Sequence, residues 1–177
     1  MKKNIKKSVK KNAPKKNMFD FRIGFGYDIH RMTEGRDLIL GGYKINYPKG
    51  MLGHSDGDLI IHSVCDAILG ALNEGEIGVY FPPTDLTLMG ISSGVIAEKV
   101  LEILKKRRAF INQIDVTLVA EEPKIKPYYE PIKKSLAKVF KIDENRVSFK
   151  AKSMEGLGEV GRGEAMICYA VAGVILK

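Results

Sequence analysis

The chain has 177 residues, of which 45% are hydrophobic, so it is long enough for one domain with a proper core. Its formal net charge of +8 comes from residues 1–17, whose eight lysines and absence of acids leave 21 of the 29 basic residues against 21 acidic ones. Because the excess charge lies in one arm without interleaved aromatic residues, nucleic acid is not a predicted partner.

The lysine-rich segment, residues 1–21, is predicted to be a disordered N-terminal arm in front of one domain, residues 22–177. It lacks the apolar region of a secretory signal, and no apolar run in the chain approaches the length of a membrane span, so no membrane partner is expected. Cys65 and Cys168 lie in apolar periodic runs, which are typical of buried free thiols. A cytoplasmic location is expected.

Helical and strand-like patterns alternate along the chain. In order they predict a strand over 22–30, short strands over 37–40 and 43–47 turning at Gly41-Gly42, a helix over 58–72, a helix over 94–108, a strand over 111–120, a helix over 130–140, a strand over 146–151 and an apolar segment over 165–176. The connecting segments 48–56, 76–85, 121–129 and 153–163 are predicted as loops, the second of them mostly extended because of Pro82-Pro83. This order predicts a single α/β (α+β) domain with one mixed β-sheet and helices packed on one face.

All three histidines lie between residues 30 and 62, which indicates one site. The strand alternation places Asp28 and His30 on one face, opposite the apolar side chains. His62 lies near the start of the following helix, with Asp58 and Asp66 four residues to either side. One carboxylate and two imidazoles can hold zinc and leave a fourth position open, as in catalytic sites. The alternatives are an exposed strand pair and an ordinary helix histidine beside a carboxylate.

Two further segments carry candidate chemistry. His54 lies with Ser55, Asp56 and Asp58 in a Gly-flanked turn before the helix, where a Ser or Asp serving as the helix N-cap is an equally open interpretation. In the glycine-rich loop after residue 152, backbone amides can approach a ligand, Lys152 and Arg162 supply positive charge, and Glu155 is a hard oxygen ligand for a divalent ion on phosphates. Phosphate binding and a flexible hairpin are both open interpretations of this loop.

Five segments together carry a resemblance: RIGFGYDIHR, GHSDGDLIIHSVCDAILGAL, EIGVYFPPTD, IDVTLVAEEPKIKPY and KSMEGLGEVGRGEA. In order and spacing they resemble the 2-C-methyl-D-erythritol 2,4-cyclodiphosphate synthase family, from about Arg22 to the C-terminus. The resemblance implies a phosphorus–oxygen lyase of the non-mevalonate isoprenoid pathway, which cyclises 4-diphosphocytidyl-2-C-methyl-D-erythritol 2-phosphate and releases CMP. It also implies a homotrimer with active sites at the subunit interfaces.

The resemblance further implies roles for individual residues. Asp28, His30 and His62 would bind zinc, and Glu155 would bind a second divalent ion, Mg²⁺ or Mn²⁺. His54 and Ser153 would stabilise the charge that develops in the transition state.

Substrate contacts are implied in three groups. Erythritol and phosphate contacts would come from Asp28, Ile29, His30, His54, Ser55, Glu76, Ile77, Gly78, Phe81, Pro82, Pro83, Thr84 and Asp85. The cytidine pocket would be formed by Ala120, Glu121, Glu122, Pro123, Lys124, Ile125 and Lys126. Diphosphate and neighbouring contacts would come from Lys152, Ser153, Met154, Glu155, Glu159 and Arg162.

The chain departs from the family pattern at Glu76, Pro83, Met89 and Glu159, all outside the metal triad. Two alternative functions follow from the same residues. One is a non-catalytic relative that binds metal or cytidine nucleotides, and the other is a metal-dependent phosphohydrolase.

Overall fold

The computed structural model describes residues 20–177, so the predicted disorder of the N-terminal arm falls mostly outside the described residues. Strand β1 (Asp20–Glu34) begins two residues before the boundary expected from the sequence and extends four residues beyond the expected end of the strand. Its length follows from pairing with the C-terminal strand along residues Asp20 to Arg31.

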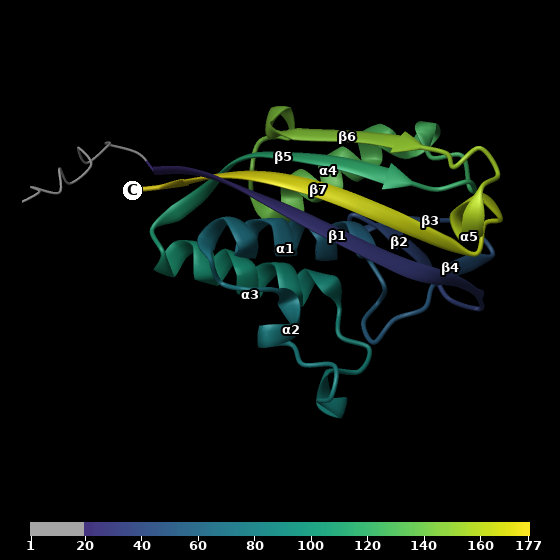
Figure 1. Cartoon of the computed structure of the whole chain (residues 1–177), viewed down its shortest axis with the longest axis horizontal. Coiled ribbons are helices and arrows are strands. Elements are labelled where there is room, and N and C mark those ends of the chain that lie inside the picture. Colours follow the sequence, from purple (N-terminus) through teal and green to yellow (C-terminus); the bar gives the residue numbers. More distant parts are fainter. Residues whose placement is uncertain (1–19) are drawn as a thin grey trace, which may run out of the picture.

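A five-stranded mixed sheet forms the centre of the fold (Figure 1). Its strand order is β4-β1-β7-β5-β6, with β4 (Lys49–Met51), β5 (Ala109–Val119), β6 (Val147–Lys152) and β7 (Ala165–Leu176). Only β5 and β6 pair in parallel; the other neighbours are antiparallel. A separate hairpin joins β2 (Leu38–Leu40) to β3 (Tyr43–Ile45), which confirms the predicted turn at Gly41-Gly42.

Three helices contact the sheet from the same side: α1 (Leu59–Leu72) against β1 and β7, α3 (Ser93–Lys106) against β5 and α4 (Tyr129–Phe140) against β6 (Figure 1). Short helices α2 (Ile77–Tyr80) and α5 (Gly158–Gly161) and the 3₁₀ turns Leu86–Leu88, Lys126–Tyr128 and Glu144–Arg146 lie in the connections. Within residues 20–177, every helix is too short or too polar to span a bilayer.

Helix α1 packs on β1 through glycine. A Cβ at Gly24 would lie 1.8 Å from the carbonyl oxygen of Ala67, and one at Gly26 would lie 1.9 Å from that of Ser63. The helix backbone therefore lies directly on the strand, which no larger residue would permit. The opposite, apolar face of β1 is not in the core: Phe25, for example, is 62% exposed.

Three loop predictions were wrong in part. Strand β4 lies within 48–56, α2 within 76–85 and α5 within 153–163. Each element has only three or four residues, which is too short for a periodic pattern, and β4 exists because its residues pair with Met32–Glu34 of β1. The final apolar segment, left unassigned by the sequence, is β7, which is paired along both edges.

Candidate active site

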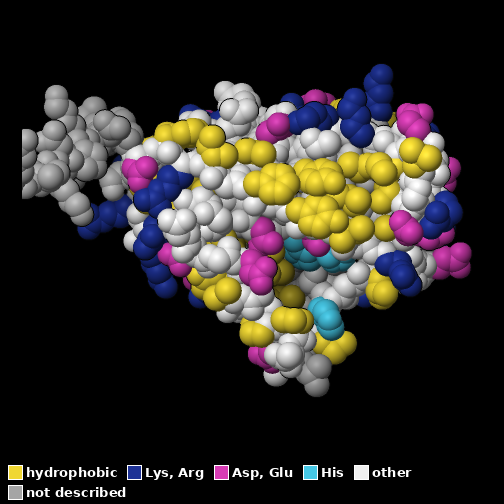
Figure 2. Space-filling view, in the orientation of Figure 1, with side chains coloured by type: hydrophobic (Ala, Val, Ile, Leu, Met, Phe, Trp, Pro, Cys, Tyr) yellow, Lys and Arg dark blue, Asp and Glu magenta, His cyan; other side chains and the backbone are white. Residues whose placement is uncertain are grey.

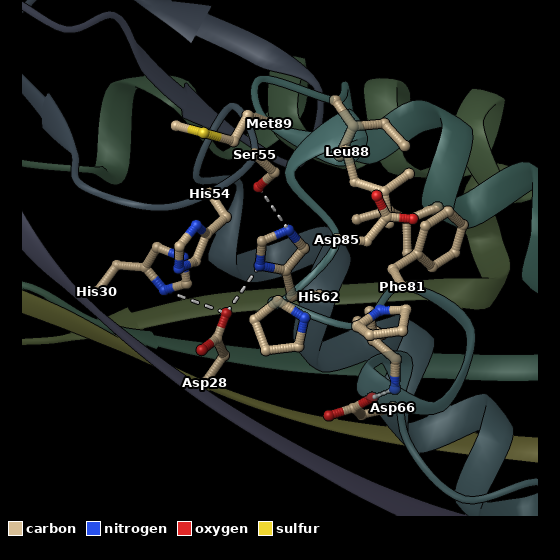
Figure 3. A pocket seen from close by; sticks show the side chains of 15 residues that line it. Asp28, His30, His54, Ser55, His62, Asp66, Phe81, Asp85, Leu88 and Met89 are labelled. Atoms are coloured by element: carbon tan, nitrogen blue, oxygen red, sulfur yellow. Dashed lines mark hydrogen bonds and ion pairs between the residues drawn. The ribbon is translucent and has the colours of Figure 1, made fainter.

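Asp28 and His30 project from the helix-facing side of β1 towards His62 in the first turn of α1 (Figure 3). Asp28 Oδ2 lies 2.9 Å from His62 Nδ1 and 3.2 Å from His30 Nδ1. One ligand atom from each residue lies within 4.8 Å of the others, and all three side chains are largely but not fully buried. The predicted triad is therefore assembled on two rigid elements, with access to solvent.

The triad fits a bound cation. His30 Nδ1 is buried and makes no hydrogen bond with any residue between 20 and 177, because its approach to Asp28 lacks hydrogen-bond geometry. Two imidazole nitrogens and one carboxylate oxygen form a donor set suited to zinc. A cation between these atoms would satisfy the unpaired nitrogen.

The pKa values of the triad reflect the same proximity. Burial raises the pKa of the Asp28 carboxyl, but His30 and His62 lower it by more, so it lies below the ordinary value of 3.8. Burial lowers the pKa of His30, but the adjacent Asp28 carboxylate raises it by more than burial lowers it. The pKa of His30 therefore lies above its ordinary value of 6.5. Without a metal, Asp28 and His30 are therefore stabilised as an ion pair of carboxylate and imidazolium.

Asp58 fixes the start of α1. Its buried carboxylate accepts hydrogen bonds from the backbone N–H groups of Ile60 and Ile61, each at 3.1 Å. It also accepts from Gly41 at 2.8 Å and Gly42 at 2.5 Å in the β2–β3 turn. Asp58 is thus the helix N-cap, which confirms the prediction that a Ser or Asp of this turn caps the helix.

Arg36 holds the turn that carries His54. Its Nη2 donates to the carbonyl of Ser55 at 2.7 Å and its Nη1 to that of Gly53 at 3.4 Å. Gly53 also makes room for the triad, since a Cβ there would lie 3.0 Å from His30 Nε2. The turn is therefore anchored on both sides of His54.

A cavity of about 260 Å³ opens beside the triad (Figure 3). Ten residues predicted for the site line it: Asp28, His30, His54, Ser55, His62, Ile77, Phe81, Pro82, Pro83 and Asp85. The Ile29 side chain points to the opposite face of β1 and is 46% exposed. Three other predicted residues of segment 76–85 are not among the residues that line the cavity: Glu76, Gly78 and Thr84.

The segments predicted to bind cytidine and diphosphate lie together at another place in the fold. Ala120 follows β5 and Lys152 ends β6, and these parallel neighbours are joined by a hydrogen bond from Ala120 N to Lys152 O at 2.9 Å. In the part of the chain that the structure describes, the triad cavity includes none of residues 120–126 and none of the predicted residues from Lys152 to Arg162.

Several cavity residues were not predicted as site residues: Asp66, Leu88, Met89, Ile91 and Ile96. Asp66 had a sequence signal, since it lies one helical turn after His62. The sequence also gave no sign of the contact between His62 and Ser93, whose hydroxyl lies 2.9 Å from His62 Nε2. That contact joins α1 to the start of α3, and only packing brings the two together.

Comparison with curated proteins finds relatives that share one name. The chain is 49% identical over 153 residues to 2-C-methyl-D-erythritol 2,4-cyclodiphosphate synthase of Prochlorococcus marinus (strain MIT 9215), covering 85% of this chain and 92% of the relative. It is 48% identical over 145 residues to the synthase of the same name from Clostridium acetobutylicum, covering 82% and 94%.

Solved structures of IspF and IspDF proteins are also similar to this chain. The CDP complex of IspF from Plasmodium falciparum matches with a TM-score of 0.78 at 38% identity, covering 89% of this chain and 97% of that one. The bifunctional IspDF of Campylobacter jejuni matches with a TM-score of 0.85 at 32% identity, covering 90% of this chain and 43% of that longer one. The model of the YgbB family matches residues 21–175. The chain therefore belongs to the YgbB family and has 2-C-methyl-D-erythritol 2,4-cyclodiphosphate synthases as its relatives.

Proposed function

We propose that the protein is a 2-C-methyl-D-erythritol 2,4-cyclodiphosphate synthase, which converts 4-diphosphocytidyl-2-C-methyl-D-erythritol 2-phosphate to the 2,4-cyclodiphosphate and CMP in the non-mevalonate isoprenoid pathway. The observation that carries the proposal is the Asp28–His30–His62 triad at the wall of a cavity, in a chain of this family.

The reaction is an intramolecular phosphoryl transfer. An oxygen of the 2-phosphate bonds to the β-phosphorus, the bond from that phosphorus to the bridging oxygen breaks, and CMP leaves with the bonding electron pair. No atom is added, so the two products together have the composition of the substrate. The main demand is to bring two anionic phosphates into line.

The triad cavity provides groups for the attacking end of the substrate. His54 is exposed at the cavity wall and Ser55 is 6% exposed beside it, so both can donate hydrogen bonds to the 2-phosphate. The apolar wall, which includes Phe81 and Pro82, suits the carbon skeleton of the erythritol unit. His54 together with Ser153 would stabilise the charge developing on phosphate oxygens.

We assign zinc to Asp28, His30 and His62, and a second divalent ion, Mg²⁺ or Mn²⁺, to Glu155. When bound, these ions supply Lewis-acid polarisation of phosphate oxygens and neutralise their charge. Glu155 has a left-handed backbone conformation (φ 51°), and its carboxylate accepts a hydrogen bond from the Ser153 hydroxyl at 3.0 Å. A lone carboxylate suits an ion whose other ligands are phosphates and water.

Residues 120–126 are assigned to the cytidine and Lys152 and Arg162 to the diphosphate, with the neighbouring predicted residues. Two solved relatives are bound to CDP, the Plasmodium falciparum IspF and a 2C-methyl-D-erythritol-2,4-cyclodiphosphate synthase, which supports a cytidine nucleotide as the ligand here.

The active form is proposed to be a homotrimer whose sites lie between subunits. The separation of the two groups of site residues within one chain supports this, because a neighbouring subunit can bring them together. The exposed apolar face of the sheet is a second support (Figure 2). It includes Phe21, Ile23, Phe25, Tyr27, Ile29, Tyr169 and Val171, which are 38–66% exposed in the single chain.

A reducing compartment, the cytoplasm, is also part of the proposal. Cys65 and Cys168 are both buried free thiols. Burial raises the pKa of Cys168 to about 12, which makes the thiol unreactive.

The test is to incubate the purified protein with the cytidyl substrate, zinc and magnesium, and to follow phosphorus resonances and CMP release together. Paired resonances of a cyclic diphosphate with equimolar CMP are expected, and His30→Ala is expected to abolish both. CMP with a linear product would instead indicate a phosphohydrolase, and nucleotide binding without CMP release a non-catalytic relative; either result would overturn the proposal.

A further inference from the structure

We propose that Asp56 and Ser93 form a hydrogen-bonded relay that orients His62, keeping its Nε2 protonated and its Nδ1 free to bind the metal. The inference rests on the zinc site proposed above and assigns positioning roles to two residues outside the triad.

The relay is continuous and enclosed. Ser93 is fully buried, and its Oγ lies 2.9 Å from His62 Nε2. On its other side, Ser93 Oγ donates a hydrogen bond to Asp56 Oδ1, and Ser93 N donates to Asp56 Oδ2 at 3.0 Å. Asp56 therefore binds both the hydroxyl and the backbone of one serine, which leaves that hydroxyl little rotational freedom.

The direction of each hydrogen bond follows from the number of protons. An ionised carboxylate can only accept, so the single hydroxyl proton of Ser93 points to Asp56. The lone pairs of Ser93 Oγ then face His62, and His62 must donate from Nε2–H. Ser55 Oγ lies 3.1 Å from the same nitrogen while it accepts from Gly57 N at 3.1 Å, and it offers a second lone pair to the same proton.

A proton fixed on Nε2 determines what the other side of the ring can do. Nδ1 of His62 lies on the triad side of the ring, 2.9 Å from Asp28 Oδ2. A neutral imidazole with its proton on Nε2 presents a lone pair at Nδ1, which is the form a metal requires. Partners of this kind, which bind the far nitrogen of a metal-ligating histidine, strengthen metal binding about 10–100-fold.

The chain offers a matched pair of serines for the test. Ser92 and Ser93 are adjacent at the start of α3, but the Ser92 side chain is exposed and caps the helix by accepting from Gly94 N. Among the described residues, it makes no hydrogen bond to His62. Ser93→Ala should therefore weaken zinc binding about 10–100-fold. Ser92→Ala should lower the thermal unfolding midpoint because the helix cap is lost, and should leave zinc affinity within about two-fold of wild type. Zinc affinity is measured on the full chain by competition with a chromophoric chelator, after circular dichroism has confirmed folding.

Asp56→Asn tests the direction of the relay with almost no change in shape. When the Asn oxygen accepts from Ser93 N, its NH₂ group faces Ser93 Oγ, and the hydroxyl proton is turned towards His62. The proton on His62 Nε2 then loses its acceptor, so zinc affinity should again fall about 10–100-fold. Asp56→Asn still tests the inference if Ser93→Ala does not fold.

A second readout reports on the proton itself. In the zinc-loaded wild type, nitrogen-15 NMR should show His62 with a slowly exchanging Nε2–H, and this proton should exchange faster in both relay variants. Zinc affinities within two-fold of wild type in both variants, or a His62 Nε2 without a proton, would overturn the inference. Absence of zinc binding in the wild type would instead overturn the metal site of the proposed function, so the two failures are distinguishable.

Discussion

At the residue scale, protons and zinc compete for the same atoms. Asp28 faces both triad histidines within 3.2 Å, and its carboxylate raises the pKa of His30 above 6.5 despite the opposing effect of burial. A protonated imidazole cannot bind a metal, so zinc must displace a proton that Asp28 stabilises. The carboxylate that serves as a ligand thus also makes the site sensitive to acid.

We therefore predict that zinc affinity falls as the pH decreases through the raised pKa of His30. The sign follows because the proton-bound form is favoured below that pKa and the metal-binding form above it. Chelator competition between about pH 5.5 and pH 8.5 should show affinity rising with pH and levelling only once the pH exceeds the raised pKa of His30. In Asp28→Asn, which binds zinc more weakly, the inflection should move to lower pH because the stabilising carboxylate is gone. Zinc affinity that is constant across this range would contradict the prediction.

At the element scale, the position of the triad depends on the close contact between β1 and α1. Gly26 lies two residues before Asp28, and its contact Ser63 directly follows His62. Any increase in the distance between strand and helix would therefore separate the carboxylate from the imidazole. Glycine at this position is a requirement of the site as well as of the fold.

Gly26→Ala is expected to destabilise the protein by about 3 kcal/mol and to weaken zinc binding, because the new Cβ would lie 1.9 Å from the carbonyl oxygen of Ser63. Gly70→Ala is the matched control: Gly70 is exposed on α1, and its nearest neighbour, Phe25 O, would lie 4.0 Å from the new Cβ. That substitution should stabilise the protein by about 0.5–1 kcal/mol. Denaturant unfolding measures the change in the free energy of unfolding for each variant. Equal changes in the two variants would argue against the backbone contact between Gly26 and Ser63.

At the scale of the whole molecule, the proposed homotrimer would complete the site with residues from a neighbouring subunit. The sheet face that includes Phe25 and Tyr27 is exposed, and Figure 2 shows an apolar patch over the sheet. Asp28 and His30 of the triad point to the other face of β1, towards α1. Since successive side chains of a strand point to opposite faces, β1 can contribute to an interface and to the metal site at once.

We predict that Phe25→Glu prevents assembly and abolishes CMP release while zinc affinity changes little, because position 25 faces away from the triad. Val95→Glu is the control: Val95 is 51% exposed on α3, outside the apolar sheet face, and this variant should remain trimeric and active. Sedimentation combined with the CMP assay separates the outcomes. A monomeric Phe25→Glu variant with wild-type turnover would refute the shared site.

The sequence by itself determined the helices α1, α3 and α4, the β2–β3 hairpin and the mixed sheet, because these elements are long enough, or have turn residues distinctive enough, to leave a local pattern. It also placed Asp28 and His30 on one face of a strand, and it carried the motifs of the family. All of these depend on neighbours within one element or on short spacings along the chain.

Only the tertiary structure decided which face of β1 lies against α1, since alternation separates two faces but does not say which is covered. It likewise decided β4, which exists through pairing with β1, and the contact between Ser93 and His62, which are 31 residues apart. It also showed that the predicted cytidine segment, residues 120–126, lies apart from the triad cavity within one chain. These features depend on how elements distant in the sequence pack together, and a local sequence pattern does not predict that packing.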